Sequence, residues 1–377
     1  MGISVSDILG ALESWMPSGM AQSWDNVGLQ VGRPEKQVTS VLVALDLTPA
    51  IIDEARGKGA NLIITHHPLF FKPLKKLSSD DLVSSMALTL AESGIAHYAI
   101  HTNIDAARNG VSFRLAHDLG LSDVEFLTSM EGSVVKLVVF VPIEANDLVR
   151  DTILAAGAGQ IGRYSDCSFS NGGTGTFKPG DDTDPFIGQA AGPRESVNEV
   201  RLEVHVSRWA LPRVLRAMTE AHPYEEVAYD IIPVENEYTD AGLGAIGTLA
   251  SSMKLTDFLD VVSTALENPA LRFAGDENAT VQKIAVCGGS GSDFIGAAMK
   301  AGADAFVTAD VTYHRYFDVM KPDGTFSMAL INAGHYETER RTEDLLGDWL
   351  SEHFPDIAVY KTALRSGPEK TWVSRRG

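Results

Sequence analysis

The sequence predicts an α/β protein built in two parts, with a smaller α+β domain inserted between them. Strand-like and helix-like runs alternate through the first third of the chain, which is typical of layered α/β domains. The pattern changes after about residue 125, and the first pattern returns at about residue 240. We therefore expect domains over residues 1–125, 126–236 and 237–377, with the first and third forming one unit.

The first segment opens with an amphipathic helix over residues 5–17, for which Ser6 is the expected N-cap. A second helix starts at Pro49, because proline is favoured in the first turn of a helix. The helix that starts at Pro49 is expected to end at residue 58. Further helices are expected over residues 80–93 and 110–120. Strands are expected over residues 38–45, 62–65 and 97–100.

The middle segment has a different order of elements. A strong strand is expected over 133–141 and a half-buried one over 199–206, with helices over 146–156 and 209–221. Residues 157–192 are rich in Gly, Ser, Asp and Pro and are expected to form loops or short strands. This β-α-β…β-α-β pattern resembles a small ferredoxin-like domain.

The third segment returns to the α/β pattern, with a helix over 255–265 and strands over 283–287, 305–308 and 327–332. The glycine-rich run 288–292 is expected to form a turn into a helix that ends at Lys300. Such a run could cradle a phosphate on its backbone N–H groups, or it could only make a tight strand–helix turn. It lacks the lysine of a Walker A motif.

Composition limits the possible partners. The 377 residues carry a net charge of -19, which argues against nucleic acid, because phosphate binding relies on clustered Lys and Arg. The two cysteines form no zinc motif and predict no disulfide framework. No apolar run is long enough to span a bilayer, and the N-terminus does not resemble a signal peptide. We expect a cytoplasmic protein that does not bind membranes.

Three separated segments carry side chains that could bind metal ions. His66 and His67 follow a predicted strand, and Asp105 follows the strand that ends near His101. His335 and Glu339 are four residues apart and would share one face of a helix. Neighbouring side chains on a strand point to opposite faces, so the two adjacent histidines could hold two neighbouring ions. Imidazole and carboxylate groups suit Zn, Mn, Fe or Co.

The sequence resembles the Nif-three-like dinuclear-metal family, some of whose members are called type-two GTP cyclohydrolase I homologues. The resemblance covers nearly the whole chain and rests on the runs 24–29, 65–68 and 101–105 and on Gly334-His335 with its trailing glutamate. It implies a two-part α/β metal-binding domain that holds two divalent metal ions per subunit. The ligands that it implies are His66, His67, Asp105, His335 and Glu339.

Other residues keep two interpretations. His101 could be a further ligand or a group that orients one, and Glu337 is the rival of Glu339. The run 309–314 departs from the family pattern in having Ala309 where a glycine is common, and His314 within it could carry protons near the metals. Either Asp25 or Asn26 could line the site or cap a turn, and Asp46 could cap the helix that starts at Pro49.

The middle segment resembles the inserted domain of longer family members, which is similar to small trimeric signalling proteins. Its marks include the run 156–169 and His222-Pro223-Tyr224-Glu225-Glu226. We expect the latter run to pack or to make interdomain contacts, with ligand binding as the alternative. By resemblance the protein assembles into a homohexameric, toroidal ring.

Two functions follow as hypotheses. The first is a metal-dependent hydrolase that acts on a small-molecule nucleotide through a metal-bound water, in a GTP cyclohydrolase-like or phosphodiester reaction. The second is a metal-binding regulatory or scaffold ring without catalysis. The two differ in whether the centre is open to water and wide enough for a nucleotide.

Overall fold

The computed structural model describes residues 2–236, 238, 240–370 and 372. The chain forms two compact units. The outer unit comprises Met1–Thr128 and Ala241–Gly377, and the inserted unit comprises Ser129–Asp240. None of the described helices is long and apolar enough to cross a membrane.

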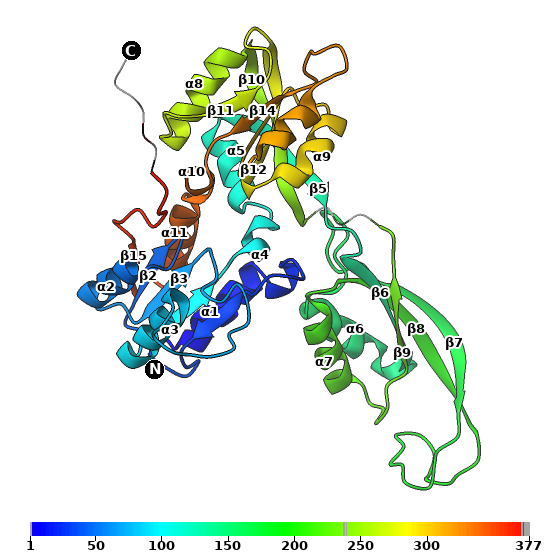
Figure 1. Ribbon diagram of the computed structural model, residues 1–377. Coiled ribbons are helices and arrows are strands. Elements are labelled where there is room, and N and C mark those ends of the chain that lie inside the picture. Colours follow the sequence, from blue (N-terminus) through cyan, green and yellow to red (C-terminus); the bar gives the residue numbers. More distant parts are fainter. Residues whose placement is uncertain (1, 237, 239, 371, 373–377) are drawn as a thin grey trace. The chain divides into compact units, whose positions relative to one another are not determined.

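The first sheet of the outer unit has five strands in the order β1-β4-β3-β2-β15. Strands β15, β2, β3 and β4 run parallel, and β1 pairs antiparallel with β4. Apolar side chains of β2 and β3 pack against helices α2 and α3 to form one core. The strands are β1 Gly28–Val31, β2 Ser40–Ala44, β3 Leu62–Thr65, β4 Ala96–Ala99 and β15 Ala358–Lys361. The helices beside them are α1 Val5–Trp15, α2 Pro49–Lys58, α3 Leu82–Ser93 and α11 Thr342–His353, with η1 Ser18–Met20 after α1 (Figure 1).

The second sheet of the outer unit has six strands in the order β11-β14-β13-β12-β10-β5. Strands β12, β13 and β14 are parallel and form its centre, while β10 and β11 pair antiparallel with them. The strands are β5 Leu121–Ser129, β10 Gly242–Lys254, β11 Arg272–Ala274, β12 Thr280–Ser290, β13 Ala305–Ala309 and β14 Ala329–Asn332. The helices are α4 Thr102–Asp105, α5 Val111–Asp118, α8 Leu255–Leu266, α9 Ile295–Lys300 and α10 His335–Glu339, with η3 Ser292–Phe294 and η4 Tyr313–Val319.

The inserted unit contains one four-stranded antiparallel sheet in the order β7-β8-β6-β9. Along the chain its elements run β-α-β-β-α-β, and both main helices pack on the same sheet through one apolar core. Figure 1 shows α6 and α7 side by side against this sheet. The elements are β6 Val134–Pro142, η2 Ile143–Ala145, α6 Asn146–Ala155, β7 Phe169–Phe177, β8 Glu195–Ser207, α7 Leu211–Ala221 and β9 Tyr229–Pro233.

Two sequence expectations about local structure are wrong. The first helix is capped by Ser4 and not by Ser6, because Ser4 and Asp7 exchange hydrogen bonds in a capping box. Residues 169–177 form a nine-residue strand instead of a loop or a short strand. This strand lies at the sheet edge and is exposed on both faces for most of its length, so it carries no apolar alternation that a sequence could reveal.

The glycine-rich run is also different from its expected turn. Strand β12 continues to Ser290, so the first three residues of the run lie in the strand. The N–H groups of Gly289 and Gly291 donate to the hydroxyl groups of Thr338 (3.0 Å) and Thr308 (2.9 Å). Protein hydroxyls therefore occupy the N–H groups that a phosphate would need, which argues against the phosphate cradle.

Candidate metal centre

The carboxyl ends of parallel strands from both sheets of the outer unit bring the expected ligands together. His66 and His67 directly follow β3. Only Ile100 separates His101 from the end of β4. His335 begins the short helix that follows β14. Ligand sites in open α/β sheets lie at this edge, where the strands stop and their loops diverge.

Four histidines of this cluster share one arrangement. Each places Nδ1 against an oxygen of the surrounding protein, which leaves Nε2 as the ring nitrogen available to an ion. Such partners fix the tautomer and the ring orientation of metal-binding histidines. The pairs are His66 with the Ile100 carbonyl (3.0 Å), His67 with Asp46 (2.7 Å), His101 with Asp25 (2.9 Å) and His335 with Asp310 (2.7 Å).

The Glu339 carboxylate lies among three of these rings. Its Oε2 atom is 3.0 Å from His67 Nε2 and 2.9 Å from His335 Nε2. Its Oε1 atom is 3.7 Å from His66 Nε2. The short helix α10 places His335 and Glu339 on one face, as their spacing predicts.

The cluster divides into two overlapping groups that could each hold an ion. Ligand atoms of His66, His67 and His101 lie within 4.8 Å of one another, and so do those of His67, His335 and Glu339. Asp105 extends the first group, since its Oδ1 atom is 3.7 Å from His66 Nε2.

The pKa values of these groups reflect burial against mutual charge. Burial lowers the pKa of His66 to about 4. Burial alone would also lower the pKa values of His67 and His335. The carboxylates beside them outweigh burial and raise these pKa values to about 9 and about 11. Although burial opposes it, the surrounding histidines hold the pKa of Glu339 well below its usual range, whereas burial and Glu339 raise that of Asp105. A cation entering this cluster would displace protons from His67 and His335.

The donor set fits a divalent cation. His66 Nε2 is buried and has no hydrogen-bond partner among the described residues, since Asp105 and Glu339 lie 3.7 Å from it. Leaving such an atom unpaired costs about 1–3 kcal/mol, a cost that a coordinated ion removes. Imidazole nitrogens and carboxylate oxygens are the ligands that Zn, Mn, Fe and Co accept.

The rival and outlying candidates lie elsewhere. Glu337 pairs with Arg365, at 2.6 Å between Oε1 and Nη2, and contacts none of the four histidines. His314 is exposed in η4, and its closest ring contact is with Tyr313, at 5.4 Å between centroids. In the same run it is Asp310 that reaches the cluster, with its backbone in the left-handed region at φ 52°.

Asp25 and Asn26 each hold a segment beside the cluster. Asp25 accepts hydrogen bonds from His101 and from the backbone of Thr102, and these hold its pKa at about 2 despite its burial. Asn26 donates to the carbonyl of Phe70 (2.6 Å) and so fastens the loop after His67. Asp25 therefore orients His101, and Asn26 holds the loop after His67.

Gly289 is a residue of the centre that sequence reasoning missed. A Cβ atom at this position would overlap Glu339 Oε1, and it would lie 3.3 Å from the His335 ring. The backbone there has φ +60°, which favours glycine. The available signal was a glycine run that ends a buried strand, which often marks a close approach of the backbone.

Comparisons with known proteins point to one family over most of the chain. The profile of the family Duf34/NIF3 (NGG1p interacting factor 3) matches residues 3–368. The chain is 41% identical over 330 residues to a "GTP cyclohydrolase 1 type 2 homolog" of Halalkalibacterium halodurans, which covers 87% of each chain. It is also 41% identical over 335 residues to the protein of that name in Bacillus subtilis, with 89% of this chain and 88% of the relative covered. A solved structure, a Bacillus cereus protein related to NIF3, superposes with a TM-score of 0.81 at 37% identity, over 99% of this chain and 100% of the other. The chain therefore belongs to the Duf34/NIF3 family.

Proposed function

We propose that this protein is a metal-dependent hydrolase that acts on a nucleotide at a centre of two divalent ions. The position of Glu339 between two groups of histidines carries the proposal. One of its oxygens faces His66, and the other faces His67 and His335. A carboxylate with this placement can bridge two ions.

His67 belongs to both groups of possible ligands, and we assign it to the second ion because its Nε2 atom is 3.0 Å from Glu339 Oε2. His66, His101 and Asp105 would hold one ion, and His67 and His335 would hold the other, with Glu339 shared. When bound, two such ions supply Lewis acidity, which lowers the pKa of coordinated water and neutralises charge on a phosphoryl or ring-carbon oxygen. The identity of the metal, among Zn, Mn, Fe and Co, would follow from cellular supply as well as from the ligands.

Access to the cluster favours catalysis over a purely structural role. The side chains of His67, Asp105 and His335 keep 24%, 21% and 34% of their surface exposed, while His66 is fully buried. The cluster is thus open on one side. Catalytic metal sites keep an open coordination position, whereas structural sites are closed by protein ligands.

Two exposed aromatic side chains beside the cluster support a nucleotide substrate. Trp24 and Phe71 are 58% and 53% exposed, and their ring centroids are 5.7 Å apart. They lie 6.0 Å and 6.3 Å from the ring of His101. A planar base can stack on such rings, so a nucleobase could rest there while its phosphates or reacting ring carbon face the ions. The names of the relatives make GTP the first nucleotide to test.

The assembly and location are proposed on the family resemblance. The β-α-β-β-α-β order of the inserted unit supports a ferredoxin-like domain. We propose a cytoplasmic homohexamer. A metal-binding ring without catalysis is the competing function.

The test combines metal analysis with a hydrolysis screen. Protein loaded separately with Zn, Mn, Fe or Co is expected to hold two ions per chain and to turn over GTP or another nucleotide with at least one metal. His66→Ala should lose both properties, while the control His117→Ala should keep them, because His117 is 84% exposed and lies outside the cluster. Two bound ions without any turnover, together with normal growth of cells carrying His66→Ala, would favour the scaffold.

A further inference from the structure

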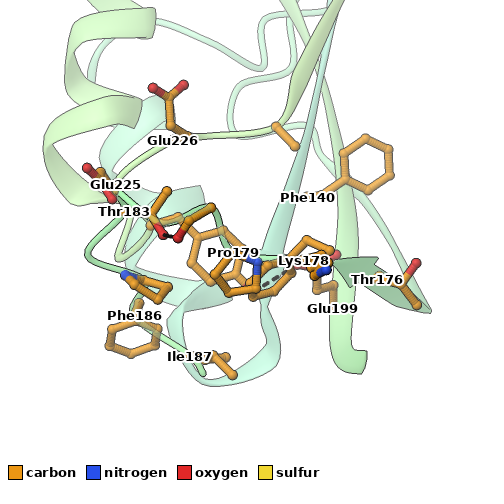
Figure 2. A pocket seen from close by; sticks show the side chains of 16 residues that line it. Phe140, Thr176, Lys178, Pro179, Thr183, Phe186, Ile187, Glu199, Glu225 and Glu226 are labelled. Carbon is orange, nitrogen blue, oxygen red and sulfur yellow. Dashed lines mark hydrogen bonds between the residues drawn. The ribbon is translucent and has the colours of Figure 1, made fainter. Parts of the chain in front are cut away.

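The inserted unit contains a pocket of its own, with a volume of about 410 Å³. All the residues that line it belong to this unit, so the pocket is separate from the metal centre. Figure 2 shows Thr183, Phe186 and Ile187 of the β7–β8 loop on one side and Phe140 of β6 on the other. The volume lies within the range of about 300–1,000 Å³ that small-molecule sites occupy.

Aromatic rings form much of the wall. The rings of Phe177 and Phe186 lie 6.1 Å and 6.3 Å from the ring of Tyr224, and Phe140 lines the same pocket. Phe186 is 62% exposed although it is a large apolar side chain. Rings at these distances leave faces available to a flat or cationic group.

A buried histidine fixes the position of Tyr224. His222 uses both ring nitrogens within the protein, Nε2 with the Phe140 carbonyl (3.1 Å) and Nδ1 with the backbone N–H of Tyr224 (3.1 Å). Burial lowers its pKa, in keeping with a neutral ring. His222 is therefore a positioning residue, and its motif serves the pocket through Tyr224 and the glutamates that follow.

The Glu199 carboxylate is built into the wall. Its Oε1 atom accepts a hydrogen bond from the Tyr224 hydroxyl at 2.9 Å. Gly175 on the neighbouring strand leaves it room, because a Cβ atom there would overlap Glu199 Oε2. Within the described residues Oε2 accepts no hydrogen bond, so it remains able to accept one from a ligand.

The charges around the pocket are mostly negative. Glu225 ties the β7–β8 loop down by accepting from the backbone N–H of Asp184 (2.8 Å), and Glu226 also lines the pocket. Among the described lining residues, Lys178 is the single basic side chain against three glutamates. Low-dielectric aromatic walls strengthen the field of such carboxylates.

We propose that this pocket binds a small organic cation with a flat apolar body, such as an aromatic amine, an amidine or a quaternary ammonium compound. The rings of Tyr224, Phe177 and Phe186 would contact its body, and Glu199 would receive its charged donor. This site does not depend on the metal centre or on the hydrolase function.

Three probes of one shape and different charge test the proposal on the full-length protein. Benzamidine is a planar cation, benzamide is its neutral counterpart and benzoate is an anion of similar outline. Ligand-observed NMR titration is expected to give binding in the order benzamidine, benzamide, benzoate. Raising NaCl from about 0.05 to about 0.5 M should weaken only benzamidine, because salt screens an accessible ion pair.

Matched variants locate the binding. Glu199→Gln keeps an acceptor for the Tyr224 hydroxyl and should weaken benzamidine about threefold to fivefold, as loss of a partly exposed ion pair would. Phe186→Ala changes an exposed loop residue, so it should fold normally and still weaken binding several-fold. Glu220→Gln on α7 does not line the pocket and should bind as the wild type does.

The proposal is overturned if the wild type binds no benzamidine, if benzoate binds as tightly, or if Glu199→Gln has no effect. If Glu199→Gln fails to fold, the salt dependence and Phe186→Ala decide the matter. Unchanged binding in Phe186→Ala would place the probe outside this pocket.

Discussion

The candidate metal centre of the outer unit and the pocket of the inserted unit hold their polar side chains in different ways. In the centre, each of the four histidines has a hydrogen-bond partner behind it and directs one nitrogen inward. In the pocket, ring faces make up much of the surface, and Glu199 is oriented by Tyr224. The difference follows from ligand chemistry, since an ion needs lone pairs at fixed positions whereas an organic cation needs area and negative potential.

The largest effect is expected from Glu339→Gln. Glu339 is the carboxylate that faces both histidine groups, so its loss should lower metal affinity at both positions by at least about 100-fold, more than the loss of an orienting partner. Elemental analysis after dialysis measures this change. The control is Glu337→Gln, which alters a contact with Arg365 and should keep both ions. Equal loss of metal in the two variants would mean that Glu339 is not the specific carboxylate ligand.

Removing a hydrogen-bond partner of a ligand should lower metal affinity less than removing the ligand itself. Asp25→Asn weakens the hold on His101 and should lower metal affinity about 10- to 100-fold, as measured by competition with a chelating dye. Glu225→Gln makes the corresponding change at the pocket loop and should leave metal affinity unchanged. If metal affinity were the same in Asp25→Asn and the wild type, His101 would not belong to the centre.

Two glycine-to-alanine variants test whether Gly289 leaves the space that the Glu339 carboxylate occupies. Gly289→Ala combines positive φ with overlap of the Glu339 carboxylate, whereas Gly302→Ala has positive φ and open space around it. Both should lose about 1–2 kcal/mol of unfolding free energy through backbone strain. Only Gly289→Ala should also lose metal, by about tenfold in affinity. Metal loss of the same size in both variants would point to general destabilisation.

The smallest effect concerns a buried histidine that is not a candidate ligand. His97 is buried beside Thr65, with 2.8 Å between Nε2 and the hydroxyl, and burial lowers its pKa to about 3. Since the folded-state pKa lies below the unfolded value of about 6.5, its contribution is complete above about pH 6.5. It is lost on acidification toward pH 3, by up to about 1.4 kcal/mol per pH unit.

His97→Gln should therefore flatten the fall in stability between about pH 6.5 and pH 5.5. Urea unfolding at both pH values measures the slope, and His117→Gln serves as the control because that side chain is exposed. The same slope in His97→Gln and the wild type would contradict the assignment of a neutral His97.

The elements that the sequence predicts best are those with strong local signals. Helix α2 and strand β3 match their expected bounds, because Pro49 and the left-handed Gly59 delimit the helix and the strand is apolar throughout. The nine-residue length of strand β7 was not expected, because an exposed edge strand rich in glycine has no apolar periodicity. Strand pairing stabilises it, and pairing partners are distant in sequence.

The candidate ligands could be named from residue types and spacing, together with a family resemblance. Their partners could not. Asp46 and Asp310 reach His67 and His335 across 21 and 25 residues of chain. Nothing in their own neighbourhoods distinguishes them from residues that cap turns, so their roles appear only when the strand ends converge.

By itself the sequence determined the α/β class, the family and the residue types of the candidate centre, because periodicity, turn residues and ligand motifs are local properties. Tertiary structure alone decided that Glu339 lies between two histidine groups, that Gly289 makes space for it, and that Glu337 faces Arg365 instead. It also decided that the His222 motif forms the wall of a pocket. These outcomes depend on distances between residues far apart in the chain, which packing sets and local sequence does not encode.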